Sequence, residues 1–498
     1  MRTRRDQVQA YRFVTRRIVS GMLSGDPETT NLPMRRLGMA VVGSVIAAAI
    51  VLGGAGAYGQ FTGNTAPLET NTLVIERETG ATYVFADGVL HPTLNYTSAR
   101  LILNEADAPV RTMSRASIAE RPRGRTVGIV GAPDALPDPK SLVGLPWSVC
   151  DVPDPGDSRR STTRLVIDRP LAGGTPLGGE AVLVRGGGQR FLLANGARAQ
   201  IVGGDPALAA LKMTNATTLD VGAPLLNAVP AGPALRRLGV EGDGAPSGRT
   251  VGGRQARVGD VFRAAGEHYV LTRDGLVSIG EVSALLLQSD GGQVTDITPD
   301  EAGRLLTDER LEAEGTLRTL PALRPVRPGQ SVVCATYRPG PGGGPPTTTL
   351  EVFDRAPAEL TGDGATAARQ GPRDAVETAD EVLLPGGRGA LVQAAPGAGE
   401  GTEPAAGATV YLITPQGMRY PLGKRSGDAV AALGYGGVKP LVVPASLLSL
   451  VPTGPTLERQ DALAYFAPDD EAGSPSPAAP GEASASPGEA SASPAQGG

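Results

Sequence analysis

Apolar residues are unevenly distributed along the chain, and the segment 37–58 contains no charged side chain at all. A helix of that length spans roughly 33 Å at 1.5 Å per residue, which is enough to cross the hydrocarbon core of a bilayer. The small residues Ala55, Gly56 and Ala57 would also suit signal-peptide cleavage, but the leader and the apolar run are both too long for that class. We therefore predict one retained transmembrane helix.

The charges on either side of this helix predict its orientation. Eight arginines precede it and the first charge after it is Glu69; the eight are Arg2, Arg4, Arg5, Arg12, Arg16, Arg17, Arg35 and Arg36. Because positively charged flanks stay in the cytosol, we expect a plasma-membrane protein with a cytosolic N-terminus. The chain beyond about residue 60 is then extracytoplasmic.

The leader itself has the pattern of an amphipathic helix. Apolar residues recur at spacings of three and four and so share one face, with arginines on its flanks: Val8, Tyr11, Val14, Ile18 and Met22, beside Arg12, Arg16 and Arg17. Gly25, Asp26 and Pro27 are expected to end the helix. Two interpretations remain open from these residues, a helix resting on anionic lipid and a docking helix for another subunit of a membrane complex.

Beyond the membrane the pattern changes to short apolar strands, and four of them are followed by a Gly-x-x-aromatic step. The four pairs are Gly80 and Tyr83, Gly188 and Phe191, Gly266 and Tyr269, and Gly417 and Tyr420. The glycine supplies the positive φ of a tight turn, and the aromatic ring packs the returning strand on its partner. We predict four repeats, each a β-hairpin with a short helix. The second and fourth end alike, in VPAGPAL and VPTGPTL.

The chain has two cysteines, Cys150 and Cys334, in similar contexts. Each is predicted to end a strand, which is followed by a Pro/Gly turn, threonines and a second strand. Since disulfides persist outside the cytoplasm, we predict that the two hairpins pair in one small domain closed by a Cys150–Cys334 disulfide. The alternative is two unrelated buried thiols. With two histidines and no CxxC or HxxxH spacing, no metal site is expected.

Composition narrows the possible chemistry. The net charge is −5 and both signs are interspersed beyond residue 68, so no basic face for nucleic acid is expected. The nearest approach to a phosphate-binding P-loop is Gly417 to Arg425, which has one residue too many, a proline, and Arg425 where Ser or Thr is required. His91 and His268 do not suggest a catalytic triad. We therefore predict no catalytic residues and no cofactor.

Several stretches taken together resemble the EccB family of the actinobacterial type VII secretion system. They are QVQAYRF followed by Arg16-Arg17 and Gly25-Asp26-Pro27, the single span, GAPDALPDPKSLVGLPWSVC, and VYLITPQGMRYPL leading to LGYGGVKPLVVPASLLSLVPTGPTL. The resemblance implies a bitopic core subunit that assembles with EccC, EccD and EccE and dimerises through its ectodomain. It also implies four repeats flanking a disulfide-closed central domain, and a leader that docks on core partners.

The resemblance leaves two alternative functions to consider. Members of the family have been labelled ATPases, although this sequence contains no P-loop. The repeats are described as similar to the cell-wall-binding subunit of a phage lysin, so a peptidoglycan-binding module is the other alternative. We expect a structural subunit that scaffolds assembly for protein export.

The predicted architecture is an α+β bitopic membrane protein with an elongated extracytoplasmic domain. We expect a cytosolic helix in 1–36, a transmembrane helix in 37–58, repeats in 68–125, 177–240, 250–318 and 382–460, a central domain in 126–176 and 319–381, and a disordered tail in 467–498.

Overall fold

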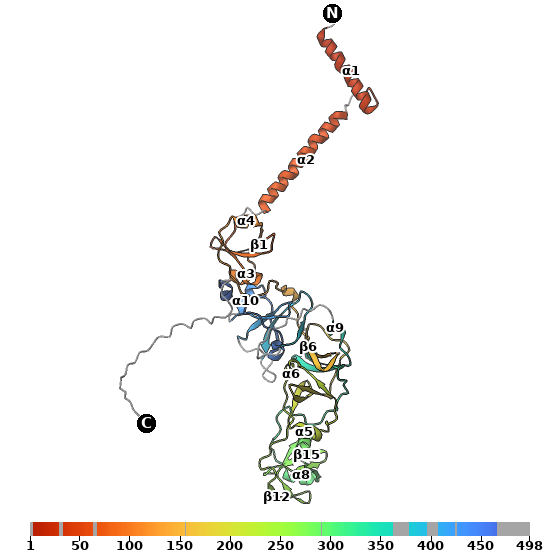
Figure 1. The fold of residues 1–498 in the computed structure, drawn as a ribbon, viewed down its shortest axis with the longest axis vertical. Coiled ribbons are helices and arrows are strands. Elements are labelled where there is room, and N and C mark those ends of the chain that lie inside the picture. The colour runs from red at the N-terminus through yellow and green to blue at the C-terminus, as the bar shows by residue number, and fades with distance from the viewer. Residues whose placement is uncertain are drawn as a thin grey trace, which may run out of the picture.

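The computed structural model describes residues 3–28, 33–62, 67–154, 156–289, 291–361, 378–395, 407–423 and 426–465. The predicted tail, 467–498, lies outside these residues. The fold is α+β, as predicted, and begins with two helices, α1 (Arg4–Ser24) and α2 (Pro33–Thr62) (Figure 1). Thr3 and Asp6 form a capping box at the start of α1. Gly25 ends α1 with φ +68°, which confirms the predicted stop.

Helix α2 contains the predicted span. Its stretch Leu37–Ala57 has a mean hydropathy of 2.2 and none of it is buried within the chain. Among the described residues it is the one helix long and apolar enough to cross a membrane.

The four repeats share one topology. In each, three antiparallel strands are followed by a helix, a fourth strand parallel to the first, and a second short helix. The first repeat comprises β1 (Thr72–Glu76), β2 (Thr82–Ala86), β3 (Val89–Pro92), α3 (Tyr96–Leu103), β4 (Val110–Met113) and α4 (Arg115–Ala119). The second comprises β8 (Ala181–Gly186), β9 (Gln189–Ala194), β10 (Ala197–Ile201), α5 (Gly204–Ala210), β11 (Thr218–Asp220) and α6 (Ala223–Ala228).

The other two repeats follow the same order. The third comprises β14 (Val261–Ala264), β15 (Glu267–Leu271), β16 (Leu276–Ile279), α7 (Glu281–Leu287), β17 (Val294–Asp296) and α8 (Pro299–Leu305), preceded by a hairpin of β12 (Pro246–Val251) and β13 (Arg254–Arg257). The fourth comprises β21 (Ala390–Ala395), β22 (Val410–Ile413), β23 (Arg419–Pro421), α10 (Ser426–Ala432), β24 (Leu441–Pro444) and α11 (Ala445–Ser449). The repeat is therefore larger than the predicted hairpin and helix.

The glycines of the Gly-x-x-aromatic steps all lie in turns with positive φ, between +74° and +88°. Three of them, Gly80, Gly188 and Gly266, lie in the turn between the first and second strands, and Tyr83, Phe191 and Tyr269 lie on the second strand. The fourth pair was matched to the wrong turn: Gly417 joins β22 to β23, and Tyr420 is on the third strand. The residue equivalent to Tyr83 is Tyr411. The segment between β21 and β22 is too long to form a tight turn. The Gly-x-x-aromatic pattern was therefore matched to the next turn, between β22 and β23.

The central sheet has six strands in the order β20-β6-β5-β18-β19-β7. Two hairpins from distant parts of the chain supply its middle, β5 (Trp147–Asp154) with β6 (Asp157–Ile167) and β18 (Val332–Arg338) with β19 (Thr347–Phe353). The edges are β7 (Thr175–Pro176) and β20 (Glu381–Leu383). Four short helices complete the described elements: η1 (Pro139–Ser141), η2 (Pro341–Gly343), α9 (Ala358–Thr361) and α12 (Arg459–Ala462).

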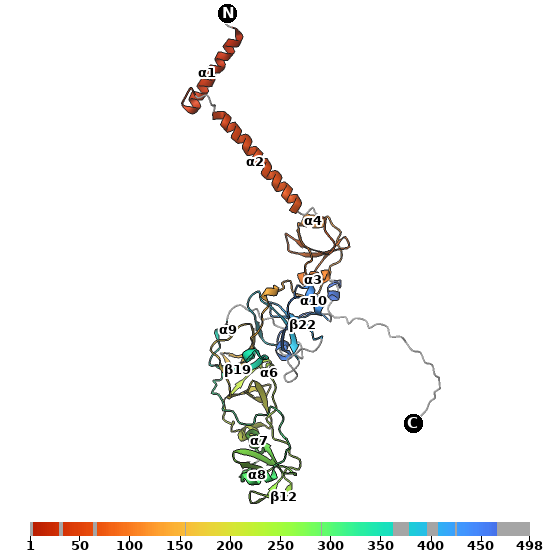
Figure 2. The same ribbon diagram turned by 180° about the vertical axis from the view of Figure 1, so that it is seen from behind.

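The modules follow one another along an elongated ectodomain (Figures 1 and 2). The first repeat adjoins α2, the fourth repeat lies beside it, the central sheet and the second repeat come next, and the third repeat is at the far end. Continuous apolar cores join neighbours. Leu73 and Ala99 of the first repeat share a core with Leu412 and Tyr435 of the fourth, and Val282 of the third packs into the core of the second.

The segment 126–142, predicted to begin the central domain, instead packs on the first and fourth repeats. Val127 bridges to Thr93 of the first repeat, and Asn95 donates a hydrogen bond from Nδ2 to the Ile129 carbonyl at 2.7 Å. The Tyr435 hydroxyl of the fourth repeat donates to the Pro137 carbonyl at 2.7 Å. The segment therefore fastens the two repeats together before the chain enters the central sheet.

We expect Tyr435→Phe to weaken this junction. Tyr435 is fully buried, so the change leaves the Pro137 carbonyl without its partner, at a cost of about 1–3 kcal/mol. The measurement is thermal or denaturant unfolding of the full-length protein in detergent. Tyr411→Phe is the matched control, because no described group accepts a hydrogen bond from the Tyr411 hydroxyl, and it should shift stability by less than about 0.5 kcal/mol. Equal effects would contradict this role of Tyr435.

Candidate functional site

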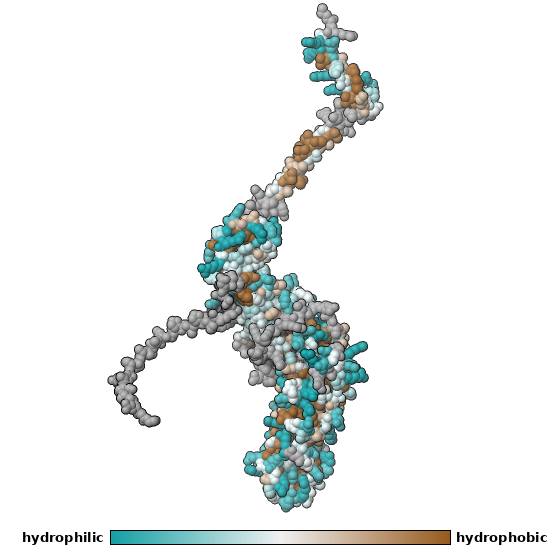
Figure 3. Space-filling view, in the orientation of Figure 1, coloured by the Kyte–Doolittle hydropathy of each residue, from teal (hydrophilic) through white to brown (hydrophobic). Residues whose placement is uncertain are grey.

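The predicted docking helix α1 presents an apolar face that no other described part of the chain covers. Val8, Tyr11, Val14 and Ile18 lie on this face with 50%, 75%, 53% and 53% of their surface exposed. Figure 3 shows hydrophobic patches along α1, with hydrophilic side chains between them. Exposed apolar side chains that gather on one face of a helix mark a site for a protein or a membrane.

The arginines of α1 are not equivalent. Arg12 and Arg16 line a shallow hollow on the helix together with Tyr11, Thr15 and Val19. Arg17 points elsewhere, because it forms an ion pair with Glu28 at 2.8 Å and its guanidinium lies 5.4 Å from the centre of the Phe13 ring. The structure therefore brings Arg12 and Arg16, but not Arg17, to the apolar face.

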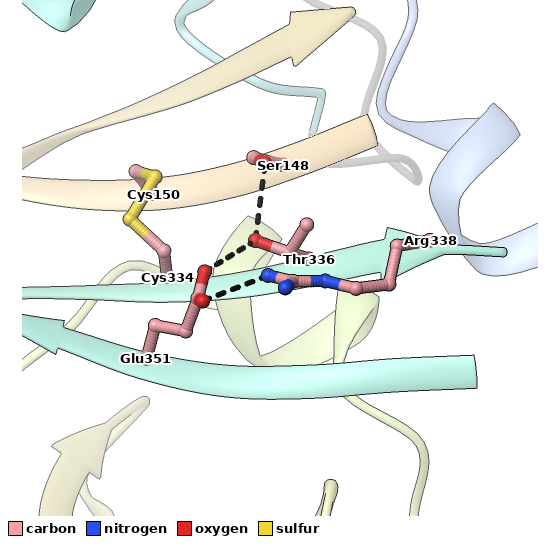
Figure 4. Close-up of a disulfide and its surroundings, with 6 residues drawn as sticks. All are labelled: Ser148, Cys150, Cys334, Thr336, Arg338 and Glu351. Carbon is pink, nitrogen blue, oxygen red and sulfur yellow. Dashed lines mark hydrogen bonds and ion pairs between the residues drawn. A yellow bond between two sulfur atoms is a disulfide. The ribbon is translucent and has the colours of Figure 1, made fainter. Parts of the chain in front are cut away.

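The second candidate region is the centre of the six-stranded sheet, where Cys150 and Cys334 form the predicted disulfide (Figure 4). The two residues are directly opposite on antiparallel β5 and β18, and both are fully buried among Val166, Phe353 and Leu383. The disulfide joins residues 184 positions apart. One detail of the prediction is wrong: both cysteines lie within their strands rather than at the ends.

A line of polar side chains continues from the disulfide across three strands (Figure 4). The Ser148 and Thr336 hydroxyls are 3.0 Å apart, and the Thr336 hydroxyl donates to Oε2 of Glu351 at 3.2 Å. Arg338 pairs with the other carboxylate oxygen at 2.8 Å. Since a shift of one residue would turn these side chains to the opposite face, the network and the disulfide together specify one register.

A further ion pair connects the sheet to β20 at its edge. Arg164 lies opposite Cys150 on β6, and its Nε is 2.6 Å from Oε2 of Glu381 on β20. Its Nη1 donates to the Leu360 carbonyl at 2.6 Å. Arg164 thus holds the chain on both sides of the segment 362–377.

Asp151 lies on the other face of β5, where the central sheet meets the second repeat. It is 3% exposed, and its Oδ1 accepts hydrogen bonds from the Thr163 hydroxyl at 2.8 Å and from the Gly222 N–H at 3.2 Å. Burial raises the pKa of Asp151 and the charge of Asp380 raises it further, while hydrogen bonds from Ser161, Thr163 and Gly222 oppose the shift. Its charged form is therefore costly in the folded protein.

The second and fourth repeats contain a shared cluster that the sequence reasoning missed. Arg198 lies 5.6 Å from the centre of the Phe191 ring and donates to the Val229 carbonyl at 3.2 Å. Arg419 lies 5.5 Å from the Tyr411 ring and donates to the Leu448 carbonyl at 2.6 Å. Burial lowers the pKa of both arginines. The matching segments VPAGPAL, which begins at Val229, and VPTGPTL, which begins three residues after Leu448, were the sequence signal for this cluster.

The stretch that comes nearest to a P-loop lies in the fourth repeat. Gly417 lies in the β22–β23 turn, while Lys424 and Arg425 are outside the described residues. Within the described part of the chain no group of three or more His, Cys, Asp or Glu side chains is placed to hold a metal ion.

Comparison with known proteins agrees with this layout. Residues 1–467 match the family model for "Type VII secretion system ESX-1, transport TM domain B". The chain belongs to the EccB family. Curated EccB relatives include the "ESX-3 secretion system ATPase EccB3" of Mycobacterium tuberculosis, 30% identical over 92% of this chain and 89% of the relative, and its namesake in Mycolicibacterium smegmatis, 31% identical over 92% and 90%.

Two solved structures resemble this chain along most of its length. A subunit in the structure of an intact ESX-5 inner membrane complex aligns with a TM-score of 0.63 at 25% identity and covers 96% of this chain and 98% of that one. The EccB3 dimer from the ESX-3 core complex aligns with a TM-score of 0.60 at 29% identity and covers 79% and 99%.

Removal of the disulfide should destabilise the ectodomain. We expect the double variant Cys150→Ser/Cys334→Ser to lose about 2–5 kcal/mol, because the bond closes a very long loop in the unfolded chain. Thermal unfolding of the full-length protein with and without reductant is the measurement. Reductant should lower the unfolding midpoint of the wild type and leave that of the double variant unchanged. An unchanged wild-type midpoint after complete reduction of the disulfide would contradict the expectation.

Asp151 should make stability depend on pH in a defined direction. Because the pKa of Asp151 is raised in the folded protein, its negative charge destabilises the folded state at pH values above that pKa. This destabilisation disappears as the pH falls toward the pKa of an unfolded aspartate, about 3.9. Asp151→Asn removes the charge and keeps an acceptor oxygen for Thr163 and Gly222.

We therefore expect Asp151→Asn to be more stable than the wild type at pH 7, with an advantage that shrinks as pH falls through the raised pKa. Unfolding midpoints at several values between pH 4 and 7 provide the measurement. An advantage that grows on acidification would contradict the sign of the effect.

Proposed function

We propose that this chain is a structural core subunit of a type VII secretion membrane complex, and that it scaffolds assembly of the complex for protein export. The observation that carries the proposal is the similarity to a subunit of an intact ESX-5 inner membrane complex over 96% of this chain. A likeness of that extent includes the membrane helix as well as the ectodomain. The cores that join neighbouring repeats suit a scaffold, since packed interiors transmit force with little deformation.

The proposed topology places α1 in the cytosol and the repeats outside the plasma membrane. Arginines are concentrated before the span, which favours a cytosolic N-terminus. A disulfide in the central sheet is consistent with an oxidising compartment. By analogy with the EccB3 dimer of the ESX-3 core complex, we propose that the ectodomain of this chain also dimerises.

Helix α1 is proposed to dock on a cytosolic part of the partner core components, EccC, EccD or EccE. Its exposed apolar face consists of Val, Ile, Tyr and Met side chains, whereas helices that lie on membranes rely on Trp, Phe and Leu. Phe13 is directed away from that face, toward the side of α1 that carries Arg17. A rigid tyrosine flanked by arginines is typical of the residues that dominate binding at protein interfaces.

Tyr11→Glu tests the docking proposal. A charge in the middle of the apolar face should lower the recovery of partner subunits about tenfold or more when the complex is purified in detergent through a tag on this chain. The matched control is Gln9→Glu, which adds the same charge on the opposite side of α1 and should leave recovery unchanged. Both variants must insert into the membrane at wild-type levels. Undiminished recovery with Tyr11→Glu would count against docking through this face.

A further inference from the structure

An unpaired strand edge lies in the first repeat beside β3. Arg123 forms a parallel bridge with Leu90, in which the Leu90 N–H donates to the Pro122 carbonyl and the Gly124 N–H donates to the Leu90 carbonyl, both at 2.9 Å. In this pattern the N–H and C=O of Arg123 itself point away from β3. No described backbone group pairs with them, so this edge is open to another strand.

The same edge is positively charged. Arg121, Arg123 and Arg125 occupy alternate positions along it, and we call these three residues the arginine edge. Arg123 and Arg125 are exposed. Glu120 is the one acidic residue between Arg115 and Asp134. Within the described residues none of the three arginines forms an ion pair; Arg121 and Arg125 instead lie over aromatic rings.

The described chain ends on this edge. Tyr465 forms an antiparallel bridge with Val127, and the Gly128 N–H donates to the Ala464 carbonyl at 3.3 Å. The guanidinium of Arg125 lies 5.0 Å from the centre of the Tyr465 ring, which is otherwise 65% exposed. Because the pairing is antiparallel, a chain continued from Tyr465 in the same direction passes Arg125 first, then Arg123, then Arg121.

The sequence after Tyr465 is complementary in charge. Residues 466–498 contain five acidic residues and no Lys, Arg or His, and the first three acids are consecutive: Asp469, Asp470 and Glu471. They follow Tyr465 by four to six residues, which is about 13–20 Å of extended chain. The arginine edge runs about 13 Å from Arg125 to Arg121. The acids can therefore reach all three arginines without a loop.

We propose that the acidic segment 469–471 of the C-terminal tail docks on the arginine edge. The tail then extends the sheet of the first repeat and links that repeat to the fourth, from which the tail emerges. Pro468 lacks an N–H, so backbone pairing is interrupted there and charge supplies the specificity. Exposed ion pairs are individually weak, but a tethered partner has a millimolar effective concentration, which favours this occupant over a free one.

Hydrogen–deuterium exchange of the full-length protein in neutral detergent tests the proposal. The readout is the exchange rate of peptides covering 119–128. We compare the wild type with Asp469→Asn/Glu471→Gln, and with the matched control Glu482→Gln/Glu489→Gln, which removes the same charge farther along the tail. Both variants keep side chains of the same size and remove two negative charges each, and the thermal unfolding midpoint of each is measured to check that the fold is retained.

We expect exchange at 119–128 to rise about tenfold in Asp469→Asn/Glu471→Gln and to be unchanged in the control. Salt at 0.5 M should reproduce the rise in the wild type, because it screens exposed charges. Equal rates in the wild type and in Asp469→Asn/Glu471→Gln would overturn the proposal, as would equal rises in both variants. If the 119–128 peptides of the wild type are protected from exchange only after anionic lipid vesicles are added, the proposal is also overturned and the arginine edge is a lipid-binding site.

Discussion

The pairing of β5 with β18 is the interaction on which the ectodomain depends. These strands come from opposite sides of a long insertion that contains the second and third repeats. They meet at Cys150 and Cys334, which are directly opposite and covalently joined. Strand pairs this distant in sequence carry a large entropy cost of closure. A bond that restricts the unfolded chain at this point offsets part of that cost and fixes the register of both hairpins at once.

A second contact between distant parts of the chain forms without a covalent bond. The first and fourth repeats are separated by the whole of the central sheet and its insertion, yet they share one apolar core. The segment 126–142 crosses this junction and is held by hydrogen bonds to both repeats. Small residues and short strands give each repeat a thin core of its own, so stability comes from sharing cores with neighbours, as in other repeat proteins.

The elements that could be predicted from the sequence are those with a strong local signal. The charge-free run of Leu37–Ala57 and the Gly25 stop needed no tertiary information, and the similar contexts of Cys150 and Cys334 indicated their pairing. The fourth strand of each repeat was not predicted, because three-residue strands such as Thr218–Asp220 leave no alternation to detect. The apolar face of α1 and the contact of Arg17 with Phe13 follow from helical spacing, whereas the ion pair of Arg17 with Glu28 depends on how the chain folds back after Gly25.

The order of the modules has a mechanical consequence. The membrane helix leads into the first repeat, whose core is continuous with that of the fourth, and the fourth shares a core with the central sheet and the second repeat. The second in turn packs against α7 of the third. Because close-packed interiors are nearly incompressible, a displacement of the first repeat is carried along this series to the third repeat. Parts of the body that chain order separates are thus made to move together by packing and by the one covalent bond at Cys150 and Cys334.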